Sequence, residues 1–480
     1  MNRRQFLQAT GVLAVTPHIP SLAAAEVQGD WRLGFQGVTE DISAQDLLVE
    51  GDIPESCFGT LYRNGPARYE RAGQRYQHWF DPDGMIQAFR IGPEGVSHRG
   101  KFVRSRKFRQ EQEAGRFLFD GAGTVFRDSV AVRNNEDTNA ANINVQPFNG
   151  ELLALWEAGA PYRIDPSTLE TRGQQQWSEE LAGVPFSAHP HVDAQGDLWN
   201  IGAASFASQP VLVLYHIGRN GVLKKYHAQP LEAMGYMHDF VLTERYLVAL
   251  NSSSLMQQGE SFVDRMTWTP SQRSELLFFE RSNFALARRI PVPATFVFHF
   301  GNAWTEAGRT CFTACEYADD SIATRAMFHL AQRDAAAATP ESRLVRYSVD
   351  VEAGQAEKTD LGVDLEFPVF DPRNPFARQT LFGVSSGRSA NAGLSGSITR
   401  IDPRSGASEH YNYGDDYIVE EAQWLPGPDG GFLVHSFLNL RQRRSGVAIL
   451  RAQALSDGPV ALATMQGALP LGFHGCFVAA

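Results

Sequence analysis

Four histidines stand in surroundings that favour a buried metal site: His189, His238, His299 and His474. Most of their immediate neighbours are apolar or small, as expected for an imidazole held in a dry interior. Four neutral imidazoles suit a borderline divalent ion such as Fe(II), leave its double charge uncancelled and can leave coordination positions open for O₂. The alternative is that each one is an ordinary core histidine with satisfied hydrogen bonds.

Short strands are the elements that would have to position these histidines. Apolar and β-branched runs alternate with clusters of Gly, Pro, Asn and Asp almost to the end of the chain. The clearest runs span residues 152–156, 211–215, 246–250 and 432–434. Amphipathic helices are few, and residues 108–117 and 324–337 are the best candidates. We therefore predict an all-β protein with a few short helices over its top face.

A closed ring of sheets would bring widely spaced residues together. A single all-β domain of this length has to hide its edge strands, and a propeller does so. Seven blades over roughly 455 residues would have about 65 residues each, longer than the ~40 to 50 of common repeat propellers, so inserted loops are expected. The histidines are separated by 49, 61 and 175 residues. Inner strands around one axis would let them converge.

Several motifs resemble those of one enzyme family. They are residues 59–66 (GTLYRNGP), residues 78–85 (HWFDPDGM) and then the four histidine segments in order, the last close to the C-terminus. From about Gly51 onwards the chain resembles the carotenoid cleavage oxygenases, which include apocarotenoid oxygenases, lignostilbene dioxygenases and retinoid isomerohydrolases. The resemblance implies a seven-bladed β-propeller with Fe(II) on its axis. It also implies oxidative scission of a carbon-carbon double bond by O₂ into two carbonyl products.

The resemblance further implies which histidines bind the metal. The family's ligand precedes a proline, as His189 does, so His189 is preferred to His191 two residues later. His238, His299 and His474 are the other three ligands that it implies. His78 lies in the family's acidic-glycine motif and is expected to be structural.

A metal-bound histidine normally donates its second ring N–H to a carboxylate or carbonyl. The resemblance implies that three glutamates have this role. Glu157 and Glu366 match the family's motifs for this role. At the third position the chain has Glu421-Ala422 where the family usually has Glu-Pro. Glu421 is therefore predicted, and Glu420 is the alternative.

The first 25 residues have the features of a twin-arginine signal peptide. Arg3 and Arg4 precede an apolar stretch that ends in three alanines, and cleavage is expected after Ala25. The alternative is an ordinary amphipathic N-terminus. We expect the twin-arginine export machinery to deliver the protein to the periplasm, and residues 26–480 to form a single propeller domain.

Charge and motifs exclude other classes of function. Removal of residues 1–25 takes away two positive charges, so the formal net charge moves from −11 to −13. Such a surface repels phosphate backbones, and no nucleic-acid partner is expected. The sequence has no P-loop, no strand-linked G-x-G-x-x-G and no G-x-S-x-G elbow, so neither a nucleotide cofactor nor a serine hydrolase is indicated.

The substrate is expected to be an apolar small molecule. The 31 phenylalanines are a generous supply for an apolar tunnel. Residues 117–119 (FLF) resemble the segment at the family's tunnel mouth and are predicted to contact a membrane peripherally, the alternative being a buried turn. Lignostilbene-cleaving relatives hold a phenol with a tyrosine and a lysine, and residues 108–145 contain neither. This favours a carotenoid or apocarotenoid, although Arg116, Arg127 or Arg133 could serve a phenolate.

Three other functions stay open at this point. The same iron site could cleave a stilbene or phenylpropenoid, or it could activate an ester as in an isomerohydrolase. The propeller could also bind a ligand without catalysis.

Overall fold

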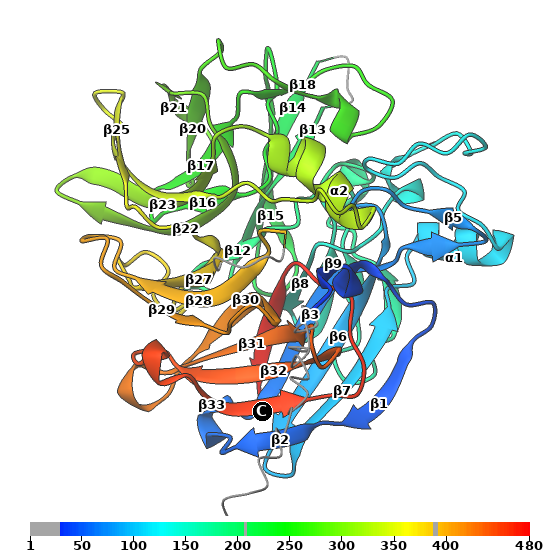
Figure 1. Ribbon diagram of the computed structural model, residues 1–480. Helices are drawn as coiled ribbons and strands as arrows, with labels where there is room; N and C mark the ends of the chain where they lie inside the picture. Colours follow the sequence, from blue (N-terminus) through cyan, green and yellow to red (C-terminus); the bar gives the residue numbers. More distant parts are fainter. Residues whose placement is uncertain (1–28, 206–208, 387–391) are drawn as a thin grey trace, which may run out of the picture.

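The computed structural model of the protein describes residues 29–480 except 206–208 and 387–391 (Figure 1). Seven antiparallel sheets of four or five strands surround a common axis. The predicted all-β, seven-bladed propeller is confirmed by this arrangement. The predicted signal peptide, residues 1–25, lies outside the described residues.

Each blade is a sheet whose strands run in order from the axis outwards. Blade 1 contains β34 (Gly475–Ala479), β3 (Gly59–Arg68), β6 (Asp83–Gly92), β7 (Gly95–Phe102) and β1 (Ile42–Asp46). Blade 2 contains β8 (Asn144–Phe148), β9 (Glu151–Leu155), β10 (Tyr162–Ile164) and β11 (Thr171–Gln174). Blade 3 contains β12 (His191–Val192), β13 (Leu198–Ala204), β14 (Val211–Ile217) and β15 (Leu223–Pro230). Blade 4 contains β16 (Phe240–Leu242), β17 (Tyr246–Asn251), β20 (Ser274–Glu280) and β21 (Leu286–Val292).

Blades 5 to 7 complete the ring. Blade 5 contains β22 (Phe296–Glu306), β23 (Arg309–Tyr317), β24 (Arg343–Asp350) and β25 (Gln355–Asp360). Blade 6 contains β26 (Glu366–Val369), β27 (Leu381–Ser386), β28 (Ser395–Ile401) and β29 (Ser408–Asn412). Blade 7 contains β30 (Tyr417–Leu425), β31 (Phe432–Asn439), β32 (Arg444–Arg451), β33 (Pro459–Thr464) and β2 (Leu48–Gly51). Within the described part of the chain, two hairpins stand outside the blades: β4 (Glu70–Arg71) with β5 (Gln74–Arg75), and β18 (Ser254–Met256) with β19 (Met266–Trp268).

The four apolar runs predicted as strands correspond to β9, β14, β17 and β31. The burial of the strands explains why these runs are so apolar. Every residue of β17 and β31 is buried, because these middle strands have a neighbouring blade on each face. The outer strand β15 alternates half-buried and exposed residues, as a strand with one wet face does.

The two ends of the described chain close the ring. The C-terminal strand β34 pairs with β3 and becomes the innermost strand of blade 1. The N-terminal strands β1 and β2 become the outermost strands of blades 1 and 7. Blade 1 therefore combines strands from opposite ends of the chain. Its innermost strand, β34, directly follows His474 and places this histidine at the axis.

The helices are short. Helix α1 (Arg106–Ala114) begins after Ser105, whose side chain accepts a hydrogen bond from the Phe108 backbone N–H, and it ends at Gly115 with a φ of 67°. Helix α2 (Met327–Ala331) continues a π-helical turn over Ile322–Ala326. Both predicted helical regions are thus helical in part, and both begin two residues earlier than predicted. No helix among the described residues is long and apolar enough to cross a membrane.

Hydrophobic cores lie between neighbouring blades. One core combines Val248 and Phe278 of blade 4 with Phe312 and Tyr347 of blade 5. A second combines side chains of blades 3 and 4. Because this packing does not depend on the axis, the ring can be stable without a ligand bound there.

Candidate metal centre

The four predicted histidines approach the axis from four different blades. His189 stands two residues before β12, His238 two residues before β16, and His474 directly before β34. His299 lies inside β22, at an irregularity in its pairing with β23. Each histidine is thus carried by the innermost strand of its blade or by the residues that lead into it.

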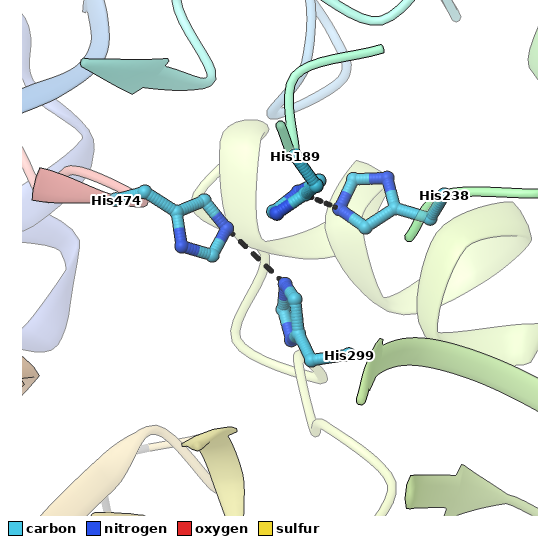
Figure 2. A group of neighbouring side chains, drawn as sticks. All are labelled: His189, His238, His299 and His474. Carbon is cyan, nitrogen blue, oxygen red and sulfur yellow. Dashed lines mark hydrogen bonds between the residues drawn. The ribbon is translucent and has the colours of Figure 1, made fainter. Parts of the chain in front are cut away.

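The imidazole rings converge on one point, as Figure 2 shows. The Nε2 atoms of His189 and His238 are 2.9 Å apart, and those of His299 and His474 are 3.1 Å apart. One ring nitrogen from each of the four lies within 4.8 Å of all the others. Two nitrogens bound at about 2.1 Å to one ion are about 3.0 Å apart at a right angle and about 4.2 Å apart across it. The cluster therefore has the dimensions of a single four-histidine metal site.

Burial keeps two of these imidazoles in the neutral form that a metal requires. Burial, helped by the neighbouring imidazoles, lowers the pKa of His189 well below its usual range. Burial also lowers the pKa of His474 to about 4, although Glu421 opposes the shift. For His299 burial acts in the same direction, but Glu366 outweighs it and the pKa is raised. A neutral imidazole has the free lone pair that a divalent ion binds.

The three blades without a histidine at the axis provide the three glutamates. Glu157 follows β9 in blade 2, Glu366 begins β26 in blade 6, and Glu421 lies in β30 of blade 7. The contacts are Glu157 Oε2 to His238 Nδ1 at 2.8 Å, Glu366 Oε2 to His299 Nδ1 at 2.5 Å, and Glu421 Oε1 to His474 Nδ1 at 2.9 Å. A proton on each Nδ1 leaves the Nε2 lone pair directed at the axis.

The structure distinguishes Glu421 from its neighbour Glu420. Besides His474, Glu421 accepts hydrogen bonds from Arg63 Nη1 at 2.8 Å and from the Gly475 backbone N–H at 2.7 Å. Glu420 accepts from the Gly472 backbone N–H and from the Ser436 hydroxyl, and it touches no histidine. Glu421 is therefore the glutamate of this pair that contacts a member of the cluster.

Sequence reasoning missed three residues around the cluster. Arg63 is 2% exposed and forms an ion pair with Glu421. The Tyr236 hydroxyl lies 2.9 Å from His238 Nδ1, beside Glu157. Asp239 is buried and hydrogen-bonds to the backbone of β22. Arg63 occurs inside the GTLYRNGP motif, and Asp239 directly follows His238. Their positions in or beside these motifs could have marked both residues as neighbours of the site.

Two further histidines, His191 and His78, lie outside the cluster. His191 Nε2 is 3.0 Å from Asp239 Oδ1. His78 uses both ring nitrogens structurally: Nε2 donates to the Ala323 carbonyl at 2.8 Å, and Nδ1 accepts from the Phe80 backbone N–H at 3.1 Å.

Comparison with known proteins identifies the family. The family model described as RPE65, retinal pigment epithelial membrane protein, matches residues 35–479. This chain belongs to the RPE65 family. Curated relatives of this family member include the apocarotenoid-15,15'-oxygenase of Synechocystis sp., 29% identical over 93% of this chain and 95% of the relative. The isoeugenol monooxygenase of Pseudomonas nitroreducens is 27% identical over 90% of this chain and 94% of the relative.

Solved structures agree with the family assignment. A cobalt-substituted form of the Synechocystis oxygenase superposes with a TM-score of 0.83, 26% sequence identity and coverage of 94% of this chain and 98% of that one. A mutant of the Synechocystis oxygenase superposes with a TM-score of 0.82 and 26% identity, over 94% of this chain and all of the other.

One cavity reaches the cluster in this RPE65 family member, and a second cavity lies next to it. The first is lined by three of the histidines and by a mainly apolar wall that includes Phe298, Phe473 and Leu471. The second is lined by Trp156, Glu157 and Tyr236, and polar residues such as Arg133 and Asn135 also border it. Phe80 and Ile143 line both cavities. The two cavities therefore adjoin beside the histidines.

The structure corrects the predicted membrane segment. Phe117 and Phe119 are 0% and 2% exposed, and Phe117 packs against Tyr76 with ring centroids 4.1 Å apart. The prediction that these phenylalanines reach a membrane is wrong, because they fill the core under this loop.

The arginines considered for a phenolate also differ in position. Arg133 lines the second cavity, and its Nε also pairs with Asp137 at 3.5 Å. Arg116 instead pairs with Asp128 at 3.2 Å, and Arg127 is exposed and lines neither cavity.

Proposed function

We propose that the protein is a non-haem Fe(II) oxygenase that cleaves a carbon-carbon double bond of a carotenoid or apocarotenoid with O₂ to give two carbonyl products. The observation that carries the proposal is the cluster of four imidazoles, whose nitrogens lie within 4.8 Å of one another at the wall of an apolar cavity. Membership of the RPE65 family and the oxygenases among its relatives support it.

The chain's own residues prepare this chemistry. His189, His238, His299 and His474 would hold the ion, and Fe(II) would supply the activation of O₂ beside the alkene. Neutral ligands suit Fe(II) because they leave its charge uncancelled and the site accessible to O₂. The three glutamates fix the tautomer and the orientation of three of the rings.

An extended apolar substrate is supported by the two adjoining cavities. Phe80 and Ile143 lie where the cavities meet beside the histidines, so a long molecule would place a central bond there. The apolar wall binds such a molecule by burial and excludes water from the reacting bond. The relative named apocarotenoid-15,15'-oxygenase supports the same substrate class.

A phenylpropenoid is the second candidate substrate. The two Pseudomonas relatives named isoeugenol monooxygenase favour it. Arg133 at the second cavity could hold a phenolate oxygen, because a guanidinium is a permanent cation with several N–H donors.

The proposal extends to location. Arg3, Arg4 and the alanines before Glu26 support twin-arginine export to the periplasm, and residues 26–480 would be the mature single domain. Peripheral membrane contact would use Val125, Val130 and Val132, which are 43% to 49% exposed; Val132 also lines the second cavity. The predicted segment of residues 117–119 plays no part in this contact.

Product analysis tests the proposal. Iron-loaded protein is incubated in air with a panel of carotenoids, apocarotenals, stilbenes and phenylpropenoids, and the products are identified by mass spectrometry, with a His238→Ala variant as the control. We expect two carbonyl fragments from a carotenoid or apocarotenoid. Fragments from phenylpropenoids alone would support the second candidate. Ester cleavage without O₂ would support an isomerohydrolase. An iron-loaded protein that turns over no member of the panel would point to a non-catalytic binding protein.

A further inference from the structure

Asp239 makes three hydrogen bonds at the centre of the ring. Its Oδ1 accepts from His191 Nε2 at 3.0 Å and from the Phe240 backbone N–H at 2.7 Å. Its Oδ2 accepts from the Phe300 backbone N–H at 2.9 Å. The side chain is 5% exposed, so water cannot readily replace these bonds.

Each partner of Asp239 stands close in sequence to a different member of the histidine cluster. His191 lies two residues after His189 in blade 3, and Asp239 itself follows His238 in blade 4. Phe300 follows His299 in blade 5. One carboxylate therefore links the segments that carry three of the four ligands.

Such a link matters because of how a propeller is built. Blades 3, 4 and 5 are separate sheets, so the ladder hydrogen bonds that fix strand positions within a blade do not extend between blades. Apolar packing between blades is non-directional. A charged hydrogen bond sets a distance and a direction, and it is about twice as strong as a neutral one.

We propose that Asp239, together with His191, is a positioning residue that sets the spacing of His189, His238 and His299 for metal binding. Neither residue touches the point on which the imidazoles converge. The inference rests on the proposed metal site but is independent of the substrate and of the reaction.

The Asp239→Asn variant breaks the link at one of the two carboxylate oxygens, either the one bonded to His191 and Phe240 or the one bonded to Phe300. The introduced amide has one acceptor oxygen and one NH₂ donor. With its oxygen at the Oδ1 position, the amide would keep the bonds of His191 and Phe240 but place a donor against the Phe300 N–H. The opposite orientation would place a donor against the Phe240 N–H. Either orientation leaves a buried backbone N–H without its acceptor, and the first one releases the strand of His299.

Asp193 provides a matched control. It is also a buried carboxylate, 7% exposed, and it also links blades 3 and 4, through Arg281 Nη2 at 2.6 Å. Its other side-chain partner is the Trp199 indole N–H at 2.8 Å. Asp193→Asn therefore removes a comparable buried charge whose side-chain partners, Arg281 and Trp199, are not members of the cluster.

The experiment measures metal binding by the purified, metal-free mature protein without air. Fe(II) is titrated to give a dissociation constant, Co(II) is added as a spectroscopic probe of ligand geometry, and denaturant unfolding of the metal-free protein reports stability. We expect Asp239→Asn to weaken Fe(II) binding by about 10-fold, the lower end of the effect of losing a carboxylate bonded to a ligand, because Asp239 acts on the ligands through the backbone rather than on their rings. Its Co(II) visible bands should also shift. Asp193→Asn should retain the wild-type constant and spectrum.

The outcomes separate this inference from the proposed function. Wild-type affinity and an unchanged Co(II) spectrum in Asp239→Asn would overturn the inference, and so would an equal loss of affinity in Asp193→Asn. If Asp239→Asn does not fold, His191→Phe decides: it removes one donor at a half-buried position, and unchanged Fe(II) binding in that variant would contradict the inference. Wild-type protein that binds Fe(II) but oxidises no substrate would refute the proposed reaction and leave this inference standing. Wild-type protein that binds no Fe(II) would refute both.

Discussion

Replacement of Glu421 by glutamine should weaken metal binding much more than the same replacement at the adjacent Glu420. In the present structure His474 Nδ1 lies 2.9 Å from Glu421 Oε1. A carboxylate can only accept here, so the proton stays on Nδ1 and the Nε2 lone pair faces the cluster. An amide at position 421 can accept on one side only.

The surroundings of Glu421 decide which side that is. Its Oε2 is approached by two donors that cannot become acceptors, Arg63 Nη1 at 2.8 Å and the Gly475 backbone N–H at 2.7 Å. The amide oxygen of Glu421→Gln therefore occupies the Oε2 position, and the amide NH₂ faces His474. To accept from that NH₂, His474 must move its proton to Nε2, where it blocks metal binding.

The size of the effect follows from these contacts. Loss of an outer carboxylate partner typically weakens metal affinity by about 10- to 100-fold. That range corresponds to about 1.4 to 2.8 kcal/mol. Arg63 keeps its charge at a buried position but loses the carboxylate paired with it. Breaking a buried ion pair costs about 3 to 5 kcal/mol, and Glu420, whose Oε1 lies 3.8 Å from Arg63 Nη2, offsets part of that cost, so the unfolding free energy should fall by about 2 to 4 kcal/mol.

The assay is an anaerobic Fe(II) titration of metal-free wild-type, Glu421→Gln and Glu420→Gln proteins, with denaturant unfolding of each. Glu420 contacts Ser436, the Gly472 N–H and, at 3.8 Å, Arg63 Nη2, but no histidine, so Glu420→Gln should bind Fe(II) as wild-type does. The reasoning is refuted if the two variants bind Fe(II) equally, or if the Glu420 variant is the weaker binder.

Four further predictions test other parts of the molecule. His238→Ala should abolish iron retention while the fold persists, because the cores lie between the blades; full iron occupancy with a native circular dichroism spectrum would remove His238 from the ligand set. Glu157→Gln should lower activity and iron affinity by about 10- to 100-fold with little change in unfolding, and wild-type turnover would make this glutamate merely structural. Burial lowers the pKa of His98 from 6.5 to about 4, so below pH 6.5 the unfolded chain binds the proton first. Stability should therefore fall from pH 6.5 towards pH 4 by up to about 1.4 kcal/mol per pH unit from this group, and His98→Gln should show a shallower dependence in denaturant unfolding at pH 7, 6 and 5. Exchange of Arg3 and Arg4 for lysine should leave uncleaved, iron-loaded protein in the cytoplasm, whereas processed protein in the periplasm would show a signal of another type.

Much of the architecture could be predicted because it depends on local patterns. The apolar runs in β9, β14, β17 and β31 are short and bounded by turn residues, so they predict strands without knowledge of their neighbours. The four histidines were indicated by their apolar surroundings, whereas the number of blades and the assignment of these histidines as ligands came from the resemblance, whose motifs extend over nearly the whole chain. The helix boundaries were less accurate, because α1 begins at the cap formed by Ser105 rather than at the first apolar residue.

Other features could not be predicted because they depend on which residues meet in space. The apolar sequence of residues 117–119 is compatible with a membrane contact and with a core, and only the packing of Phe117 on Tyr76 decides for the core. Arg63 pairs with a residue 358 positions away. The sequence around residues 117–119 does not show what Phe117 packs against, and the sequence around Arg63 does not show that it pairs with Glu421.

The sequence alone determined which residue types were available at the axis and in what order, because strand periodicity and turn residues act over a few positions. It left Glu420 and Glu421 open, since neighbouring residues in a regular strand point to opposite faces and either register was possible. Only the tertiary structure decided this, through the irregularity in β30 between Val419 and Ala422 that directs Glu421 to His474. In the same way, His191 is so close to His189 in sequence that it could have been a ligand. It pairs with Asp239 instead, because blade 4 places that carboxylate beside it.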